Sequence, residues 1–501
     1  MIGLLIQDNA YEQDIRELLM SFYPGETYAH EVKEDVDFYV QTQLENGEAS
    51  IGIWEKPEEK EMKEADKSAL KMSAPEGLKD WNLSCISWGK ADLSDHSATK
   101  NVIKKLFYQM LVKRTGHELP WGSLTGIRPT KIALSRLEAG WKEEEIRSFM
   151  KETYMTSDEK IDLSIEIAAR EKRLMEPVDY NRGYSLYVGI PFCPTTCLYC
   201  SFTSYPISKW KGRTGLYLEA LFKELEYTAE KMKGRPLDTI YFGGGTPTSL
   251  PAEDIDAILC KLEQLFDTKN VLEFTVEAGR PDSITEEKLK VLASHGISRI
   301  SINPQTMNQK TLDLIGRRHT VENVKEKFHM ARELGFDNIN MDLIMGLPEE
   351  NLDDVKHTLE EIEALRPDSL TVHSLAIKRA ARLNMFKEEY GDLKISNTPE
   401  MIALSEACAR RMGMEPYYLY RQKNMAGNFE NVGYSLPGKA CLYNILIMEE
   451  LATIVACGAG TTTKVVFPSE NRRERCENVK EVEQYISRVD EMIGRKEKIL
   501  N

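Results

Sequence analysis

Six apolar, β-branched segments alternate with helical stretches between residues 184 and 375, and this rhythm limits the possible folds more than any other feature. The stretches Leu216–Met232, Asp254–Phe266 and Val321–Leu334 are among the expected helices. Strands that alternate with helices form parallel sheets with right-handed crossovers. We therefore expect an α/β fold, open or curled into a partial barrel, with its chemistry at the carboxyl ends of the strands. The expected strands are Ser185–Gly189, Asp238–Phe242, Glu273–Val276, Ser298–Ile302, Asn338–Ile344 and Ser369–His373.

Three cysteines directly follow the first of these strands, at Cys193, Cys197 and Cys200. Thiolates at this spacing can hold three irons of a [4Fe–4S] cluster and leave the fourth iron open for a cofactor. A structural zinc site wants four nitrogen or sulfur ligands, and no histidine lies between His117 and His295 to complete one locally. A disulfide between two of the cysteines would leave the third thiol without a partner. The spacing favours a redox or radical iron–sulfur site, with a structural metal as the alternative.

Charge and composition limit the possible binding partners of the protein and its cellular compartment. The formal net charge of −15 argues against a general nucleic-acid surface, although it allows one local basic pocket for an acidic small molecule. No apolar stretch reaches the ~20 residues that cross a bilayer, so we expect no membrane span. The first residues lack the basic region of a signal peptide, and an odd number of cysteines, nine, suits a reducing compartment. These features predict a cytoplasmic protein.

The length of 501 residues exceeds one ordinary core and predicts several domains. We expect an N-terminal α+β accessory domain over residues 1–175, the βα core over 176–375 and a C-terminal domain over 376–501 that covers the substrate. In the first domain, Ser97 is expected to cap an amphipathic helix. Beyond the core, the sequence predicts helices at Pro399–Met412 and near Val479–Arg495, and a Gly/Asn-rich section at Tyr417–Gly438.

Glycines and polar residues stand where later strands of the core end. Gly243, Gly244, Gly245 and Thr246 follow the second strand, and successive glycines let backbone N–H groups approach a ligand closely. Farther along, Glu277 ends the third strand, Gln305 follows the fourth and Asp342 lies late in the fifth. Each one taken singly is explained equally well as a helix cap or as the partner of a buried loop amide. Together at one edge of the sheet, they predict a ligand site beside the cysteines.

These motifs resemble those of the radical S-adenosylmethionine (SAM) superfamily. Within it, four segments are similar to the oxygen-independent coproporphyrinogen III oxidase group: Leu186–Cys193, Tyr241–Thr248, Arg299–Gln305 and Asp342–Pro348. The long N-terminal unit and the segment Leu419–Tyr434 resemble the HemZ-type coproporphyrinogen dehydrogenase branch. The resemblance implies a partial (β/α)6 radical SAM barrel with an N-terminal α+β domain and a C-terminal extension.

The resemblance also implies a role for each matched residue. The three cysteines would hold a [4Fe–4S] cluster whose open iron chelates the amino and carboxylate groups of SAM, with one SAM bound or two. Tyr187 matches an aromatic beside the cluster, and Tyr187 and Glu277 are the expected catalytic residues. SAM would be contacted at the methionine by Gly244, Gly245, Thr246 and Glu277, at the adenine by Tyr199, at the ribose by Gln305, at the carboxylate by Arg317, and at the ribose or a second ligand by Asp342.

Three positions depart from the oxidases of established activity. Phe202 stands where they have a fourth cysteine, and Gly189 stands where they have a histidine. The family pattern Glu-x-Asn-Pro becomes Glu277-Ala-Gly-Arg-Pro281. A phenylalanine at the position of the fourth cysteine is similar to the haem-chaperone branch, whose members bind haem and lack oxidase activity.

The resemblance implies oxidative decarboxylation of two propionates of coproporphyrinogen III to vinyl groups, with a cellular electron donor for the cluster. The alternatives are a haem-binding chaperone and a radical SAM enzyme that acts on haem itself. Because a substrate with four carboxylates needs cations near the barrel mouth, we expect Arg421 and Lys423 to bind it, with Arg379 and Arg382 as further candidates. A monomer is expected.

Overall fold

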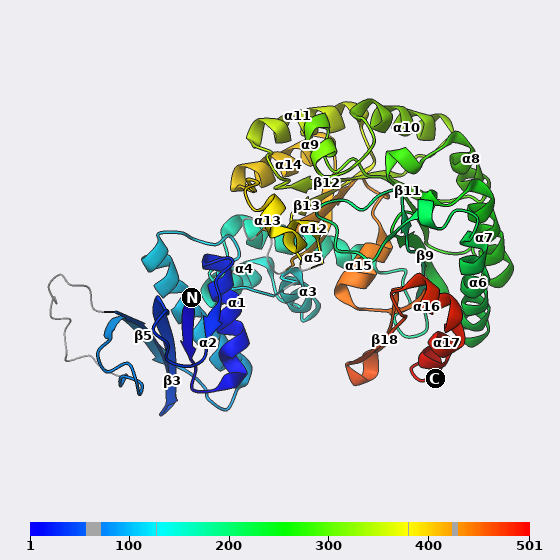
Figure 1. Ribbon diagram of the computed structural model, residues 1–501. Helices are drawn as coiled ribbons and strands as arrows, with labels where there is room; N and C mark the ends of the chain where they lie inside the picture. Colours follow the sequence, from blue (N-terminus) through cyan, green and yellow to red (C-terminus); the bar gives the residue numbers. More distant parts are fainter. Residues whose placement is uncertain (57–71, 127, 379, 423–428, 501) are drawn as a thin grey trace. The chain divides into compact units, whose positions relative to one another are not determined.

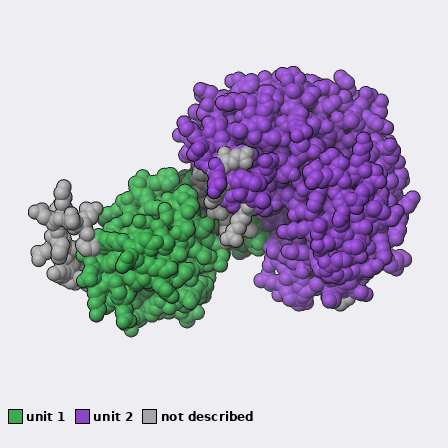
Figure 2. Space-filling view, viewed as in Figure 1, with its two compact units in different colours: residues 1–165 green, residues 166–501 purple. Residues whose placement is uncertain are grey.

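The computed structural model describes residues 1–56, 72–126, 128–378, 380–422 and 429–500. The chain divides into two compact units, residues 1–165 and residues 166–501, coloured separately in Figure 2. The division falls inside helix α5 (Asp158–Leu174). The expected division into three domains differs in one respect, since residues 376–501 share a unit with the core.

Unit 1 is an α+β fold with a five-stranded sheet in the order β2-β1-β3-β4-β5. Its first strand is parallel to β2 and β3, while β3, β4 and β5 are antiparallel. Apolar side chains of α1 and α2 share one core with the sheet, among them Leu18 and Phe107. The predicted cap of α2 is wrong by two residues: the Asp95 carboxylate accepts the N–H groups of Ser97 and Ala98. The elements are β1 (Ile2–Leu5), α1 (Glu12–Phe22), β2 (Tyr28–Ala29), β3 (Phe38–Glu45), β4 (Glu48–Glu55), β5 (Asn82–Lys90), α2 (His96–Thr115), α3 (Thr130–Glu138) and α4 (Glu143–Tyr154).

Unit 2 is built on six parallel strands in the order β13-β12-β11-β10-β9-β6. Apolar residues on both faces of these strands are buried, as parallel strands between layers of side chains require. All six predicted strands are confirmed, and so is the α/β fold. They are β6 (Tyr184–Ile190), β9 (Leu237–Gly244), β10 (Glu273–Gly279), β11 (Arg299–Ile302), β12 (Ile339–Met345) and β13 (Ser369–Ser374).

Helices follow one another along the outside of this curved sheet (Figure 1). Strand β6 pairs with β9 and β16 rather than with β13, so the barrel is partial and its two edges stay apart. The predicted partial (β/α)6 barrel is therefore confirmed. The outer helices are α6 (Thr214–Lys231), α7 (Ala252–Leu265), α8 (Glu286–Ser294), α10 (Val321–Glu333) and α11 (Leu352–Leu365), with the short α9 (Gln309–Leu314) after β11.

The C-terminal residues extend both edges of the barrel sheet. At one edge, β15 (Asn431–Ser435) is antiparallel to β13 and pairs with β14 (Glu415–Tyr420). Helix α15 (Leu442–Glu449) then leads to the opposite edge, where β16 (Thr453–Cys457) lies parallel to β6. The antiparallel strands β17 (Thr462–Phe467) and β18 (Arg472–Glu477) complete an eleven-stranded sheet.

Two features of the C-terminal residues were not predicted from the sequence. The Gly/Asn-rich section supplies strands β14 and β15, because its tyrosines pack against the sheet and Gly433 lets the Tyr418 ring lie on its backbone. The expected helix Val479–Arg495 is two helices, α16 (Val482–Ser487) and α17 (Val489–Glu497), since Arg488 between them leaves the helical region with φ −124 and ψ 24. The remaining helices are α12 (Arg382–Met385), α13 (Lys387–Tyr390) and α14 (Pro399–Arg411).

Candidate functional site

A cavity of about 940 Å³ opens at the carboxyl ends of the barrel strands. Its wall includes the cysteine loop, the turn after β9 and the last residues of β10, β11 and β12. Strands β6, β13, β14, β17 and β18 and helix α15 also contribute to the lining. The cavity therefore lies where parallel α/β folds place their ligands.

The three cysteines lie together on one side of this cavity, on the loop after β6. Among the described residues that line the cavity, they are the only cysteines. Cys193 belongs to the short strand β7 (Phe192–Cys193), which pairs with β8 (Tyr205–Pro206), and its Sγ lies 3.6 Å from Thr246 Oγ1. Burial, together with negative charge on Cys197 and Cys193, raises the pKa of Cys200 to about 11. Cys193 and Cys197 are buried and Cys200 is half-buried, and three thiol ligands on one loop at a cavity wall are a donor set that fits an iron–sulfur cluster.

The glycine turn after β9 is clamped onto the cysteine strand. The N–H groups of Gly245 and Thr246 donate to Ile190 O and Phe192 O at 2.7 and 2.8 Å. The barrel backbone therefore occupies these two N–H groups, whereas the Gly244 N–H bonds to the Glu277 carboxylate. The carbonyl groups and the Thr246 hydroxyl remain, and these acceptors suit an ammonium donor. Gly244 has φ +119, a conformation that favours glycine.

Glu277 lies in the lumen among stacked tyrosine rings. The Tyr241 hydroxyl donates to Glu277 Oε1 at 2.6 Å. Burial raises the pKa of Glu277 to about 7, against the lowering effect of this hydrogen bond. The ring of Tyr443, from α15, stacks at 4.4 Å on Tyr241 and at 6.0 Å on Tyr187. Near neutral pH, the Glu277 carboxyl can therefore face the cavity either neutral or ionised.

Gln305 and Asp342 face the cavity from the ends of β11 and β12. Gln305 has φ 70, and its backbone bonds to Asp342 O and Ile344 N, both at 2.9 Å, so it is fixed beside β12. Burial raises the pKa of Asp342, but the hydrogen bond and charge of His373 and the amide of Asn340 outweigh burial and lower it below its usual range. Asp342 therefore presents an ionised carboxylate to the cavity.

Arg317 connects the cysteine loop to the β11 loop. Its guanidinium donates to Cys197 Sγ at 3.9 Å and to the Tyr199 hydroxyl at 3.4 Å. A further bond reaches Asn303 O, while Arg317 Nε has no hydrogen-bond partner among the described residues. A buried guanidinium with an unused donor on a cavity wall is suited to a carboxylate ligand. The side chain of Tyr199 lines the same wall.

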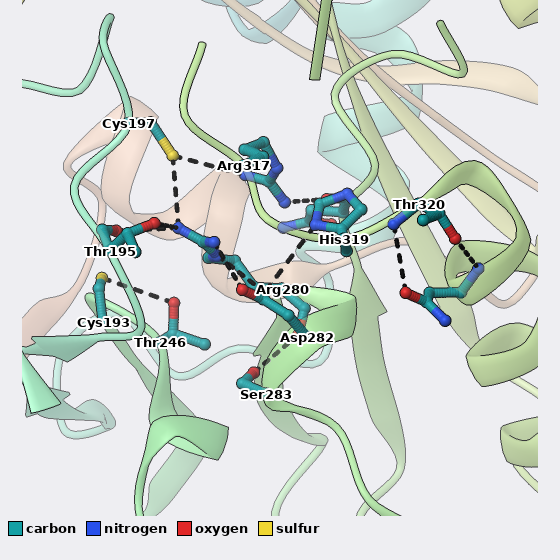
Figure 3. A network of polar contacts seen from close by, with 12 residues as sticks. Cys193, Thr195, Cys197, Thr246, Arg280, Asp282, Ser283, Arg317, His319 and Thr320 are labelled. Carbon is teal, nitrogen blue, oxygen red and sulfur yellow. Dashed lines mark hydrogen bonds and ion pairs between the residues drawn. The ribbon is translucent and has the colours of Figure 1, made fainter. Parts of the chain in front are cut away.

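Sequence reasoning missed a second arginine at the cysteines. Arg280, just after β10, donates from Nη1 to Cys197 Sγ at 3.7 Å and to Thr195 Oγ1 and O at 2.7 and 2.9 Å. Figure 3 shows Arg280 and Arg317 directed at Cys197, with Asp282 and His319 behind them. The signal in the sequence was the departure Glu277-Ala-Gly-Arg-Pro281, whose extra residue forms a bulge between β10 and β11. That bulge accompanies the placement of Arg280 under the cysteine loop.

The expected substrate residues have mixed outcomes. Arg421 is buried and does not line the cavity, whereas its neighbours Tyr420 and Gln422 do. Alternate side chains of an extended segment point to opposite faces, which explains this placement. Lys423 and Arg379 lie outside the described residues, and Arg382 is exposed on α12 without lining the cavity. The cations of the cavity rim are instead Lys378, Lys464, Arg475 and Lys480.

The structure accounts for one departure from the oxidases and describes the other. A Cβ at Gly189 would lie 2.4 Å from Thr461 Cγ2, so the loop after β16 occupies the space of a side chain at this position. Phe202 lines the cavity and is 72% exposed, and the Lys378 ammonium lies 5.9 Å from the centre of its ring. The place of a fourth thiol is thus an apolar surface at the cavity mouth.

Comparison with known proteins identifies the family of the chain. Residues 187–362 match the family model of the radical SAM superfamily. The chain is 42% identical over 428 residues to the oxygen-independent coproporphyrinogen-III oxidase-like protein HemZ of Bacillus subtilis, covering 85% of each chain. It is 34% identical to heme chaperone HemW of the same organism, over 48% of this chain and 63% of that one.

A solved structure gives a similar result. The structure of coproporphyrinogen III oxidase (HemN) from Escherichia coli, a radical SAM enzyme, matches with a TM-score of 0.50 and 24% identity, over 63% of this chain and 71% of that chain. This likeness supports the fold. Among the described residues, no helix has the length and apolar character that crossing a membrane requires.

Proposed function

Because this chain belongs to the radical SAM superfamily, in its HemZ-type branch of oxygen-independent coproporphyrinogen III oxidase-like proteins, we propose that it converts coproporphyrinogen III to protoporphyrinogen IX. Superfamily membership implies a [4Fe–4S] cluster and SAM. When bound, the reduced cluster would supply the electron for reductive cleavage of SAM, and SAM would supply the radical chemistry that removes hydrogen from a propionate side chain. We place the reaction in the cytoplasm, with a cellular reductant as electron donor.

The residues of the chain would hold and shield these groups. Cys193, Cys197 and Cys200 would ligate three irons, and Arg317 would pair with the SAM carboxylate. The carbonyls of the glycine turn and Glu277 would accept from the amino group, with Tyr199 at the adenine and Gln305 and Asp342 at the ribose. Burial raises the pKa of Tyr187, so its neutral ring forms an apolar wall that excludes water from a reactive intermediate.

The observation that carries the substrate assignment is the basic rim on β17 and β18. Lys464 and Arg475 both contact Glu450 Oε1 at 2.7 Å, and Arg473 Nε lies 3.5 Å from Glu450 Oε2. Among the described residues of this wall, Lys464, Arg475 and Lys480 line the cavity with one carboxylate, Glu477, so the wall keeps a surplus of positive charge after Glu450 is paired. Such a rim suits the propionates of a tetrapyrrole. The cavity, about 940 Å³, lies at the large end of the ~300–1,000 Å³ range of ligand pockets.

One observation favours a second candidate, a haem chaperone. The exposed Phe202 ring at the cavity mouth offers an apolar contact to a porphyrin face where the oxidases have a thiol. The similarity to heme chaperone HemW covers about half of this chain. A carrier would hold haem without changing its mass.

Product mass in an anaerobic reaction separates these functions. The reconstituted protein, with SAM, dithionite, coproporphyrinogen III and an added electron acceptor, should release two CO2 per porphyrinogen. The double variant Lys464→Ala/Arg475→Ala should raise KM for coproporphyrinogen by at least tenfold, since each lost charge-assisted bond costs about 1.5–3 kcal/mol. Uncoupled SAM cleavage should stay unchanged.

The matched control is Arg472→Ala, which removes a β18 cation that does not line the cavity. Its KM should equal that of the wild type. Unchanged porphyrinogen mass together with tight, stoichiometric haem binding would reject the oxidase in favour of the carrier. Loss of CO2 from haem, but not from coproporphyrinogen, would make haem the substrate.

A further inference from the structure

Arg280 is the side chain that joins the cysteine loop to strand β10. Its Nη1 reaches three acceptors on the loop, namely Thr195 O, Thr195 Oγ1 and Cys197 Sγ. Only 4% of the side chain is exposed. A cation held in a region of low dielectric acts strongly on nearby charge.

The opposite end of the same guanidinium is fixed by a carboxylate. Asp282 accepts from Nε and Nη2 of Arg280 at 2.9 and 2.7 Å, a bidentate arrangement that fixes the plane of the guanidinium. Burial raises the pKa of Asp282, but its contacts with His319 and Arg280 outweigh burial and keep it below its usual range, so the carboxylate is ionised. His319, whose side chain is fully buried, approaches Asp282 with Nδ1 at 3.8 Å from Oδ1.

This arrangement is directional. The Asp282 carboxylate lies on the Nε side, whereas Nη1 points at the Cys197 sulfur, as Figure 3 shows. The Cys197 sulfur therefore faces the guanidinium, which is the positively charged member of the Arg280–Asp282 pair. Arg317 approaches the same sulfur at 3.9 Å, and it also faces the cavity with an unused donor. The N–H groups of Arg280 bond to protein groups, so its charge acts on the Cys197 sulfur.

We propose that Arg280, oriented by Asp282, sets the reduction potential of the cluster by placing a fixed positive charge and an N–H donor on the Cys197 sulfur. Reduction adds one electron to the cluster from an external reductant, and a nearby cation stabilises the added negative charge. Arg280 is thus a positioning residue that acts through Cys197. The inference rests on the superfamily assignment and is independent of the porphyrinogen substrate.

The test is a potentiometric titration of the reconstituted, full-length protein, followed by electron paramagnetic resonance of the reduced cluster. In Arg280→Gln, the ratio of reduced to oxidised cluster at a fixed potential should fall about tenfold, which corresponds to 59 mV for one electron. Asp282→Asn should change this ratio in the opposite direction, because it removes the counter-charge. Arg280→Lys should lie between the wild type and Arg280→Gln.

Arg411→Ala is the matched control, since Arg411 is exposed and bonds to Glu363 at 2.7 Å on the outside of the barrel. Iron content per chain is measured in every variant. An unchanged midpoint in Arg280→Gln with full iron content would overturn the proposal. A fall of the midpoint in both Arg280→Gln and Asp282→Asn would also overturn it, because the asparagine amide oxygen can still accept one Arg280 bond, so that removing the counter-charge must raise the midpoint if the Arg280 charge acts on the sulfur. If Arg280→Gln holds no iron, the midpoints of Asp282→Asn and Arg280→Lys test the proposal. It then requires a rise in Asp282→Asn and a fall in Arg280→Lys.

Discussion

Gly245→Ala should damage the cysteine loop itself. A Cβ at this position would lie 2.6 Å from Phe192 O and 2.9 Å from Cys193 Sγ. The Phe192 carbonyl also accepts the N–H of Thr246 at 2.8 Å, so it cannot turn away without losing a strand bond. The glycine is therefore required by the approach of two backbones, before any ligand is considered.

The size of the effect follows from this geometry. Overpacking of a well-packed site costs typically 1–3 kcal/mol. Unit 2 spans residues 166–501 and would unfold with an entropy of about 0.7 kcal/mol per kelvin, taking about 2.1 cal/mol per kelvin per residue. The melting temperature should consequently fall by about 1.5–4 °C. Cys193 must move as well, so the iron bound per chain should decrease.

The matched control is Gly215→Ala in helix α6, where a Cβ would meet nothing within 4 Å. This variant should be at least as stable as the wild type, because Gly215 lies in the first turn of α6 and its added methyl group meets no atom. Thermal unfolding followed by circular dichroism, together with iron analysis, measures both variants. If Gly245→Ala melts at the wild-type temperature and holds a full cluster, the proposed clash between the two loops is refuted.

Three further predictions concern the cluster, SAM and pH. Single alanine variants at Cys193, Cys197 or Cys200 should abolish the brown chromophore, whereas alanine at any of the other six of the nine cysteines should leave iron content intact. Arg317→Ala should weaken SAM binding by roughly 1.5–3 kcal/mol in calorimetry, while its exposed neighbour Arg318→Ala should not; equal affinities would remove Arg317 from the SAM site. The folded pKa of Glu277, about 7, exceeds its ordinary value of 4.5, so its contribution to stability is present below pH 4.5 and lost as pH rises to 7. Glu277→Gln should thus gain stability relative to the wild type over that interval in urea unfolding at several pH values, and parallel curves would contradict the buried carboxyl.

The barrel could be predicted from the sequence because each strand is short, apolar and separated from the next by a helix. Strands such as β6 and β12 are buried on both faces, and this burial requires a nearly continuous run of apolar residues. The two strands β14 and β15 could not be predicted in this way. Strand β15 contains Asn431 and Gly433, residue types that are typical of loops, and in the fold the Tyr418 ring of β14 packs on the backbone of Gly433.

Some residues of the candidate site could be predicted from the sequence, and others could not for the same reason. The cysteines and Glu277 stand at strand ends, where position along the chain predicts position in space. Arg280 was missed, because the bulge that accompanies its position beneath Cys197 depends on the pairing of β10 with β11. Arg421 was expected at the substrate, but the alternation of the extended segment turns it away from the cavity and leaves Tyr420 and Gln422 there. Which face a side chain takes is decided by pairing register, which composition does not encode.

The order in which the strands are synthesised has a consequence for cluster assembly. Strand β6 carries the cysteine loop, and one of its two neighbours is β16, with Tyr184 opposite Thr453. At about 5–20 residues per second, a ribosome has left β6 behind well before β16 emerges. Until then the first barrel strand is an exposed edge, and the Thr461 contact that confines Gly189 does not exist. Iron insertion into a settled loop is therefore a late event that follows completion of the chain, and truncation before β16 should yield a protein that cannot retain its metal.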